Sequence, residues 1–167
     1  MTDTVQVYRV YIKATPQAIW DAITKPEWTQ KYGYTGLAEY DLRPGGKHRS
    51  RPTQEFIDMG ITGDLLDGEV LEVDPPRKLV VTWRMLMDPG MAAEGFTKLT
   101  YDIEETKTAG TRLTVTHDLT GAPGLASMVA GEGEILDGSE ANAGGGWAWI
   151  LSDLKTLLET GSNVASH

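Results

Sequence analysis

Cysteine is absent from this chain of 167 residues. Its absence excludes disulfides, thiolate nucleophiles and cysteine-ligated metals. No apolar run approaches the roughly 20 residues that a membrane-spanning helix needs. The first four residues lack a basic region followed by an apolar stretch, so no secretory signal is recognisable. We therefore expect a cytoplasmic protein that does not insert into a membrane.

Positive charge is scarce. The chain has 15 Lys and Arg against 24 Asp and Glu, and its formal net charge is −9. Nucleic acids and anionic membranes both bind proteins through Lys and Arg, so neither is expected as a partner. The hydrophobic fraction of 40% is ordinary for a globular protein. We predict one domain over residues 1–161 and a frayed tail over 162–167.

The first third of the chain predicts a strand, two short helices and a hairpin. Residues 5–12 are rich in β-branched and aromatic side chains, which favour strands. Thr15 followed by Pro16 is typical of a helix start, and Pro26 opens a second short helix. Two extended runs flank the turn residues 44–46, which indicates a hairpin.

The middle of the chain predicts a run of strands after a loop. We expect residues 52–68 to form a loop with at most one helical turn. The strands that follow are predicted at 69–73, 78–87, 96–105 and 111–119. Alternation in the second of these places five apolar side chains on one face, namely Leu79, Val81, Trp83, Met85 and Met87.

The last helix is predicted from Gly146 to a C-terminal cap at Gly161. Its apolar stripe consists of Trp147, Ile150, Leu151, Leu154, Leu157 and Leu158. Trp149 lies to one side of that stripe and is expected to pack under residues 120–143. That segment is rich in Gly, Ala and Ser and shows no clear apolar period, so we predict a mobile lid.

These elements predict an α+β protein in which a curved antiparallel sheet of six to seven strands wraps around the C-terminal helix. The apolar face of the sheet needs cover, and the last helix is the long amphipathic element available to provide it. A strongly twisted sheet cannot lie flush along one helix. Either a cavity of roughly 300–1,000 Å³ opens between them, or large side chains fill the space.

Several segments together resemble a known superfamily. They are residues 14–24 (ATPQAIWDAIT), 41–46 (DLRPGG), 68–83 (GEVLEVDPPRKLVVTW), 110–117 (GTRLTVTH) and 146–147 (GW). In this order they resemble the SRPBCC (START-like, helix-grip) superfamily, and within it the group named for the activator of the ninety-kilodalton heat-shock chaperone ATPase. The resemblance covers about residues 5–160.

The resemblance implies a helix-grip fold with a deep pocket between the sheet and the last helix. It does not select a function, because the superfamily includes lipid carriers, hormone receptors, polyketide cyclases and chaperone activators. The residues themselves show no Walker A loop and no Gly-x-Ser-x-Gly elbow. His48, His117 and His167 are far apart and lack ligand spacing, so we expect neither a metal nor a cofactor.

His117 is the most informative titratable residue. Its neighbours in strand alternation are Val115 and Leu119, so it should face inward. One interpretation is a core histidine bonded to the backbone or to Tyr101. The other is a pocket-wall hydrogen-bonding group or a general base. Trp83 and its neighbouring methionines are likewise either core or an adaptable pocket wall.

The favoured function is non-catalytic binding of a small hydrophobic or amphipathic molecule. The pocket is predicted to be lined by Tyr40, Trp83, Met85, Leu99, Tyr101, His117, Trp147 and Leu151. One alternative is a cyclase- or hydrolase-type enzyme with His117 as base and Tyr101 as donor. Another is a protein-interaction module similar to a chaperone ATPase activator, which would bind a chaperone or form a homodimer. An enzyme needs two or more acid and base groups that converge on one point. The sequence offers one clear inward candidate, so binding is favoured.

Overall fold

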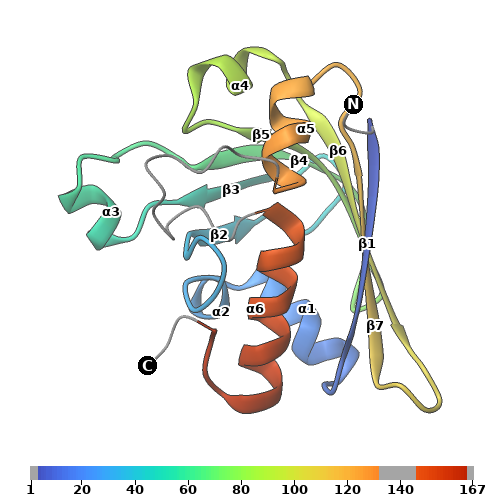
Figure 1. The fold of residues 1–167 in the computed structure, drawn as a ribbon. Coiled ribbons are helices and arrows are strands. Elements are labelled where there is room, and N and C mark those ends of the chain that lie inside the picture. Colours follow the sequence, from blue (N-terminus) through green and yellow to red (C-terminus); the bar gives the residue numbers. More distant parts are fainter. Residues whose placement is uncertain (1–3, 132–145, 165–167) are drawn as a thin grey trace.

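The computed structural model describes residues 4–131 and 146–164 (Figure 1). Its strands are β1 (Val5–Ile12), β2 (Leu37–Tyr40), β3 (Lys47–Arg51), β4 (Leu66–Asp74), β5 (Lys78–Met85), β6 (Thr97–Glu105) and β7 (Thr111–Asp118). Its helices are α1 (Pro16–Thr24), α2 (Pro26–Thr29), α3 (Gln54–Asp58), α4 (Pro89–Ala93), α5 (Pro123–Val129) and α6 (Gly146–Thr160).

The strands form one antiparallel sheet in the order β1-β7-β6-β5-β4-β3-β2. The strands β1 and β2, which follow each other in sequence, lie at opposite edges, and α1 and α2 connect them. The sheet curves around α6 (Figure 1). The predicted α+β helix-grip fold is therefore confirmed, with seven strands and two short helices after the first strand.

Both early helices begin where the sequence predicts. Thr15 caps α1, because its Oγ1 accepts a hydrogen bond of 3.1 Å from the backbone amide of Ala18. Pro16 and Pro26 occupy the first turns of α1 and α2, where proline costs no hydrogen bond.

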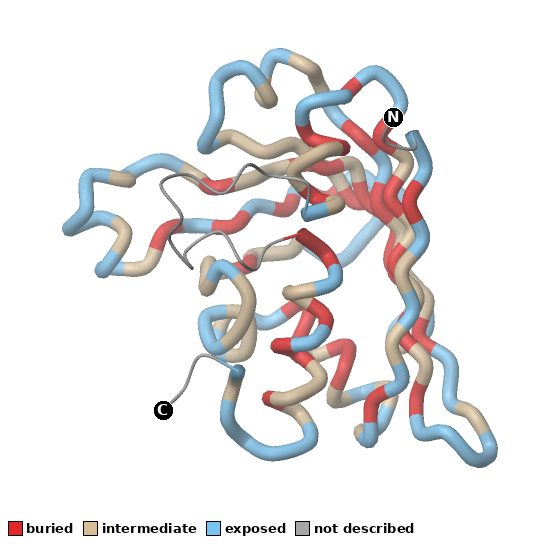
Figure 2. Tube along the Cα trace, viewed as in Figure 1, coloured by how far each residue is buried: buried red, intermediate tan, exposed pale blue. Residues whose placement is uncertain are grey.

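The core lies between the concave face of the sheet and the helices (Figure 2). Its centre consists of alternate residues of β5, β6 and β7, all with no accessible surface: Leu79, Val81, Leu99, Leu113 and Val115. The predicted stripe of α6 packs onto them. Trp147, Leu151, Leu154 and Leu157 are buried, and Ile150 and Leu158 are half-buried.

Two connections differ from the prediction. The segment 52–68 contains the helical turn α3, but β4 already begins at Leu66. After β5 the chain forms α4, which the sequence analysis missed. Asp88 caps α4 by accepting hydrogen bonds from the amides of Gly90 and Met91. The Asp-Pro-Gly run that resembles a turn is therefore a capped helix start.

The described part of the predicted lid packs against the core. Residues 123–129 form α5, in which Leu125, Ala126 and Val129 are buried. The expectation that this part lacks an apolar period was wrong, since Leu125 and Val129 lie four residues apart on one helix face. The rest of the predicted lid lies outside the described residues.

The last helix ends at Gly161, whose φ of +86° gives the predicted C-terminal cap. Beyond it, the backbone amide of Val164 donates to Asp153 Oδ1 at 2.6 Å. Asn163 donates to the carbonyl of Lys31, also at 2.6 Å. In the described part of the chain, no helix has the length and apolarity required to cross a membrane.

Docking of α6 predicts a large effect for Leu154→Ala. Leu154 is 1% exposed, so the substitution should lower the free energy of unfolding by about 2–5 kcal/mol through lost burial and a residual cavity. The matched control is Leu42→Ala, because Leu42 is exposed in the hairpin connection; it should cost less than about 1 kcal/mol. Chemical denaturation measures both. Equal losses would contradict the docked helix.

Candidate functional site

A cavity of about 430 Å³ lies between the concave face of the sheet and α6. Trp83, Met85 and Tyr101 line it from the sheet, and Trp147 and Leu151 line it from α6. Its size falls within the predicted range, and its lining is mainly apolar. Arg49 and Asp88 are the charged residues among the described lining residues. Such a space suits an apolar molecule with few polar groups.

Six of the eight predicted pocket residues line this cavity: Tyr40, Trp83, Met85, Tyr101, Trp147 and Leu151. The structure places Leu99 and His117 behind the wall. Both face inward, as strand alternation requires, but neither has accessible surface. Alternation determines the face on which a side chain lies and not its depth below that face, which explains the difference.

His117 is a core histidine with both ring nitrogens bonded. Nδ1 accepts a hydrogen bond from Trp147 Nε1 at 3.1 Å, which leaves the proton on Nε2. Nε2 lies 2.8 Å from Thr97 Oγ1, and that hydroxyl donates to the carbonyl of Trp83 at 2.8 Å. The partners of the His117 ring are therefore Thr97 and Trp147, and not the backbone or Tyr101. No ring nitrogen is left to contact a ligand.

His117 instead positions two residues of the cavity wall. Its bond to Trp147 fixes the indole of α6, and its ring packs edge-on against Trp83 with centroids 5.3 Å apart. Desolvation by burial lowers the pKa of His117 from 6.5 to about 4, and the nearby Asp118 carboxylate only partly opposes this shift. The ring is therefore neutral at physiological pH.

A second buried histidine supports the wall at Tyr40. His48 is 2% exposed, and its ring stacks on Tyr40 with a centroid distance of 5.1 Å. Nε2 lies 2.6 Å from the carbonyl of Thr82, two strands away in the sheet. The ring reaches it by crossing over Gly68, where an added Cβ would lie 2.4 Å from Nε2 and 1.8 Å from the Thr82 oxygen. Position 68 therefore requires glycine, because the imidazole and the Thr82 carbonyl leave no room for a side chain.

The backbone hydrogen bonding between β4 and β5 is interrupted where His48 crosses Gly68. The amide of Glu69 donates to Thr82 Oγ1 at 2.8 Å, and the Thr82 carbonyl bonds His48. A side-chain hydroxyl and an imidazole therefore replace one backbone pair between β4 and β5. Burial lowers the pKa of His48, although the hydrogen bond to Thr82 and the Asp67 carboxylate oppose the shift.

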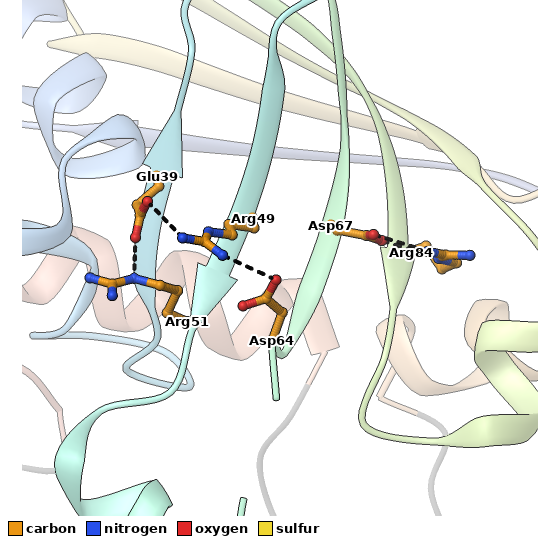
Figure 3. A network of polar contacts seen from close by, with 6 residues as sticks. All are labelled: Glu39, Arg49, Arg51, Asp64, Asp67 and Arg84. Carbon is orange, nitrogen blue, oxygen red and sulfur yellow. Dashed lines mark hydrogen bonds and ion pairs between the residues drawn. The ribbon is translucent and has the colours of Figure 1, made fainter. Parts of the chain in front are cut away.

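The opposite, convex face of the same strands is charged. Figure 3 shows Arg49 between Glu39 and Asp64, Arg51 bonded to Glu39, and Asp67 bonded to Arg84. The Arg84 guanidinium binds Asp67 through two hydrogen bonds of 3.1 and 2.9 Å. The alternation of β3 thus places cations on the convex face and His48 with Ser50 on the cavity side.

The sequence analysis missed several lining residues. Tyr32 and Tyr34 follow α2 in a segment without strand or helix period, so no pattern indicated their direction. Met91 and Met128 come from α4 and α5, which were not predicted. Together with Met85 and Met87 they give the cavity four methionines, a lining that adapts to irregular ligands.

The opening of the cavity is marked by its exposed lining residues. Tyr34 and Met87 are each about half exposed, and Asp88 is exposed beside Met87. Trp149 does not reach the cavity lining; its ring lies 5.7 Å from that of Tyr34. Trp149 was predicted to pack under residues 120–143, of which 132–143 lie outside the described residues.

The arrangement of a curved antiparallel sheet, one long C-terminal helix and an apolar cavity between them defines the helix-grip, START-like class of proteins. Within that class, the profile of the family described as "Activator of Hsp90 ATPase homolog 1-like protein" matches residues 13–159. The chain therefore belongs to this family. No curated protein matches it significantly.

Solved structures share the fold at low sequence identity. The protein SSP2350 from Staphylococcus saprophyticus has a TM-score of 0.63 at 18% identity, over 98% of this chain and 97% of that one. The Aha1 dimer from Colwellia psychrerythraea has a TM-score of 0.59 at 20% identity, over 94% and 97%. PFC0360w, an HSP90 activator from Plasmodium falciparum, has a TM-score of 0.51 at 22% identity, over 68% and 71%.

The enclosure of His117 predicts a pH-dependent stability. An NMR titration of the ring should give a pKa of about 4. The unfolded chain takes up this proton below about pH 6.5 and the folded chain does not, so stability should fall as the pH drops from 6.5 toward 4. The loss from this group is about 3 kcal/mol. This pH-dependent loss of stability should be missing in His117→Gln. A measured pKa near 6.5 would contradict the burial of the His117 ring.

The crossing of His48 over Gly68 predicts that Gly68→Ala is destabilising. The added methyl must displace the Thr82 carbonyl or the imidazole, so we expect a loss of about 1–3 kcal/mol in the free energy of unfolding. Gly63→Ala is the matched control, because no atom lies within 4 Å of its added Cβ; it should be neutral or slightly stabilising. Equal behaviour of the two variants in urea denaturation would disprove the close approach.

Proposed function

We propose that this protein binds a small hydrophobic or amphipathic molecule in the cavity between the sheet and α6. The observation that carries the proposal is the cavity itself, which is about 430 Å³ in volume, open at Tyr34 and Met87, and lined mainly by aromatic and aliphatic side chains. A protein of this size usually fills its core at high density. An apolar space of these dimensions with an opening is the usual form of a small-molecule site.

The construction of the wall supports the same proposal. His117 holds Trp147 from behind, and the ring of His48 stacks on Tyr40. These contacts fix large aromatic side chains around an empty volume instead of letting them collapse into it. A preorganised cavity lowers the entropic cost of binding a ligand.

The geometry gives less support to an enzyme of cyclase or hydrolase type. The base predicted for it was His117, which is sealed and has both nitrogens bonded to Thr97 and Trp147. The predicted donor Tyr101 does line the cavity. A hydroxyl alone does not provide the converging acid and base groups that such a reaction needs.

A second candidate function is self-association through the outer face of β1, or contact with a chaperone there. Val5, Val7 and Tyr11 are each about half exposed on this edge strand. Similar folds include a dimer and an HSP90 activator. Light scattering after gel filtration tests self-association: a dimer that Val7→Lys converts to a monomer would support it, and a monomer at all concentrations would exclude it.

The binding proposal predicts different dye affinities for two Met→Trp substitutions. Met85 lines the cavity, so Met85→Trp places an indole in the binding volume and should weaken Nile red binding by about tenfold or more, or roughly 1.4 kcal/mol. Met59 is exposed and does not line the cavity, so Met59→Trp should leave the affinity unchanged. The dye's fluorescence titration measures both.

The same titration shows whether the dye binds outside the cavity. Equal affinities for parent, Met85→Trp and Met59→Trp would show that the dye binds elsewhere. No binding to the parent protein at micromolar dye would contradict the proposed function. Thermal unfolding of each variant verifies that it is folded.

A further inference from the structure

Three of the tyrosines that line the cavity, from three different elements, have buried hydroxyls that influence one another. Tyr40 comes from β2, Tyr101 from β6 and Tyr32 from the segment after α2, and all three line the cavity. They are close enough to affect one another electrostatically: Tyr40 raises the pKa of Tyr32, and both of them raise the pKa of Tyr101. The curvature of the sheet therefore assembles a group of phenols at a mainly apolar cavity.

The three hydroxyls differ in their bonding. Tyr32 Oη donates to the carbonyl of Ala22 at 2.8 Å, so its proton is used. No hydrogen bond joins Tyr40 Oη or Tyr101 Oη to any residue in 4–131 or 146–164. Among these residues, His48 Nδ1 is the one fully buried side-chain atom without a hydrogen-bond partner, so neither phenol oxygen is fully buried, and both tyrosines line the cavity. Tyr101 is only 8% exposed overall. A buried hydroxyl normally has a partner.

The surroundings favour a neutral partner for these two hydroxyls. Burial raises the pKa of Tyr40 and of Tyr101, so both remain protonated donors at neutral pH. The carboxylate of Asp153 raises the pKa of Tyr32 electrostatically and would repel an anion bound near this group. Arg49 is the cation among the described lining residues, but Glu39 and Asp64 hold its guanidinium on the convex face (Figure 3).

We propose that Tyr40 and Tyr101 form a polar subsite that selects uncharged apolar ligands carrying a carbonyl or hydroxyl oxygen over hydrocarbons and over carboxylates. This inference rests on the proposed binding function. An oxygen placed there accepts hydrogen bonds from one or both phenols. A hydrocarbon would remove water from the two hydroxyls without replacing its hydrogen bonds, which is costly. A carboxylate would bury its charge without a cation to pair it.

The test uses three probes on one skeleton: 2-acetonaphthone, 2-ethylnaphthalene and 2-naphthoate, each measured by displacement of Nile red. The quantity of interest is the ketone affinity divided by the hydrocarbon affinity. Tyr40→Phe and Tyr101→Phe should each lower this ratio by about 2- to 10-fold, since one neutral hydrogen bond is lost in each. Tyr11→Phe is the control, because Tyr11 lies exposed on the outer face of β1; its ratio should equal that of the parent.

The outcomes separate this inference from the proposed function. If Nile red does not bind, the proposed function fails. If the dye and probes bind but both Tyr→Phe variants keep the parent ratio, the function stands and the subsite is refuted. Tighter binding of 2-naphthoate than of 2-acetonaphthone would also overturn the inference, since it requires a cationic site. Should Tyr101→Phe fail to fold, Tyr40→Phe and the comparison of naphthoate with ketone in the parent still decide.

Discussion

The hydrogen bond from Trp147 to His117 is the contact on which the cavity depends. It joins the start of α6 to the concave face of the sheet. Near the other end of the helix, Lys155 donates to the carbonyl of Tyr11 at 2.6 Å, and Glu159 accepts from the amide of Lys13. The helix is thus held against β7 and β1, while the sheet curves away toward β2. The volume enclosed by this divergence is the cavity.

A second layer of polar groups supports the walls of the cavity. His117, with Thr97 behind it, holds one end of the cavity, and His48, which crosses Gly68, supports the other. Both imidazoles are buried, and burial lowers the pKa of each, so neither introduces a charge at neutral pH. Polar groups therefore maintain a mainly apolar space, and in the proposed binding mode a ligand would contact the aromatic rings that they position.

Much of this architecture follows from the sequence, because it depends on periodicity. Alternation in β5 and the stripe of α6 correctly predicted that Trp83, Met85, Trp147 and Leu151 face one volume. Periodicity carries no information on depth, so it left open whether His117 lies in the core or on the cavity wall; the residue lies in the core, behind the wall. Tyr32 was missed because it lies outside any regular element. The helices α4 and α5 were missed because Gly, Pro and Ala resemble a loop in isolation. The Asp88 cap starts α4, and burial of Leu125, Ala126 and Val129 stabilises α5.

The central claim, that an apolar molecule occupies the space between sheet and helix, is tested most directly by an isotope-filtered NOE experiment on labelled protein with 2-acetonaphthone. The account predicts contacts from the naphthalene protons to Trp83, Met85 and Leu151, which lie on both sides of the cavity. Contacts confined to Val5 and Val7 on the outer face of β1 would contradict it.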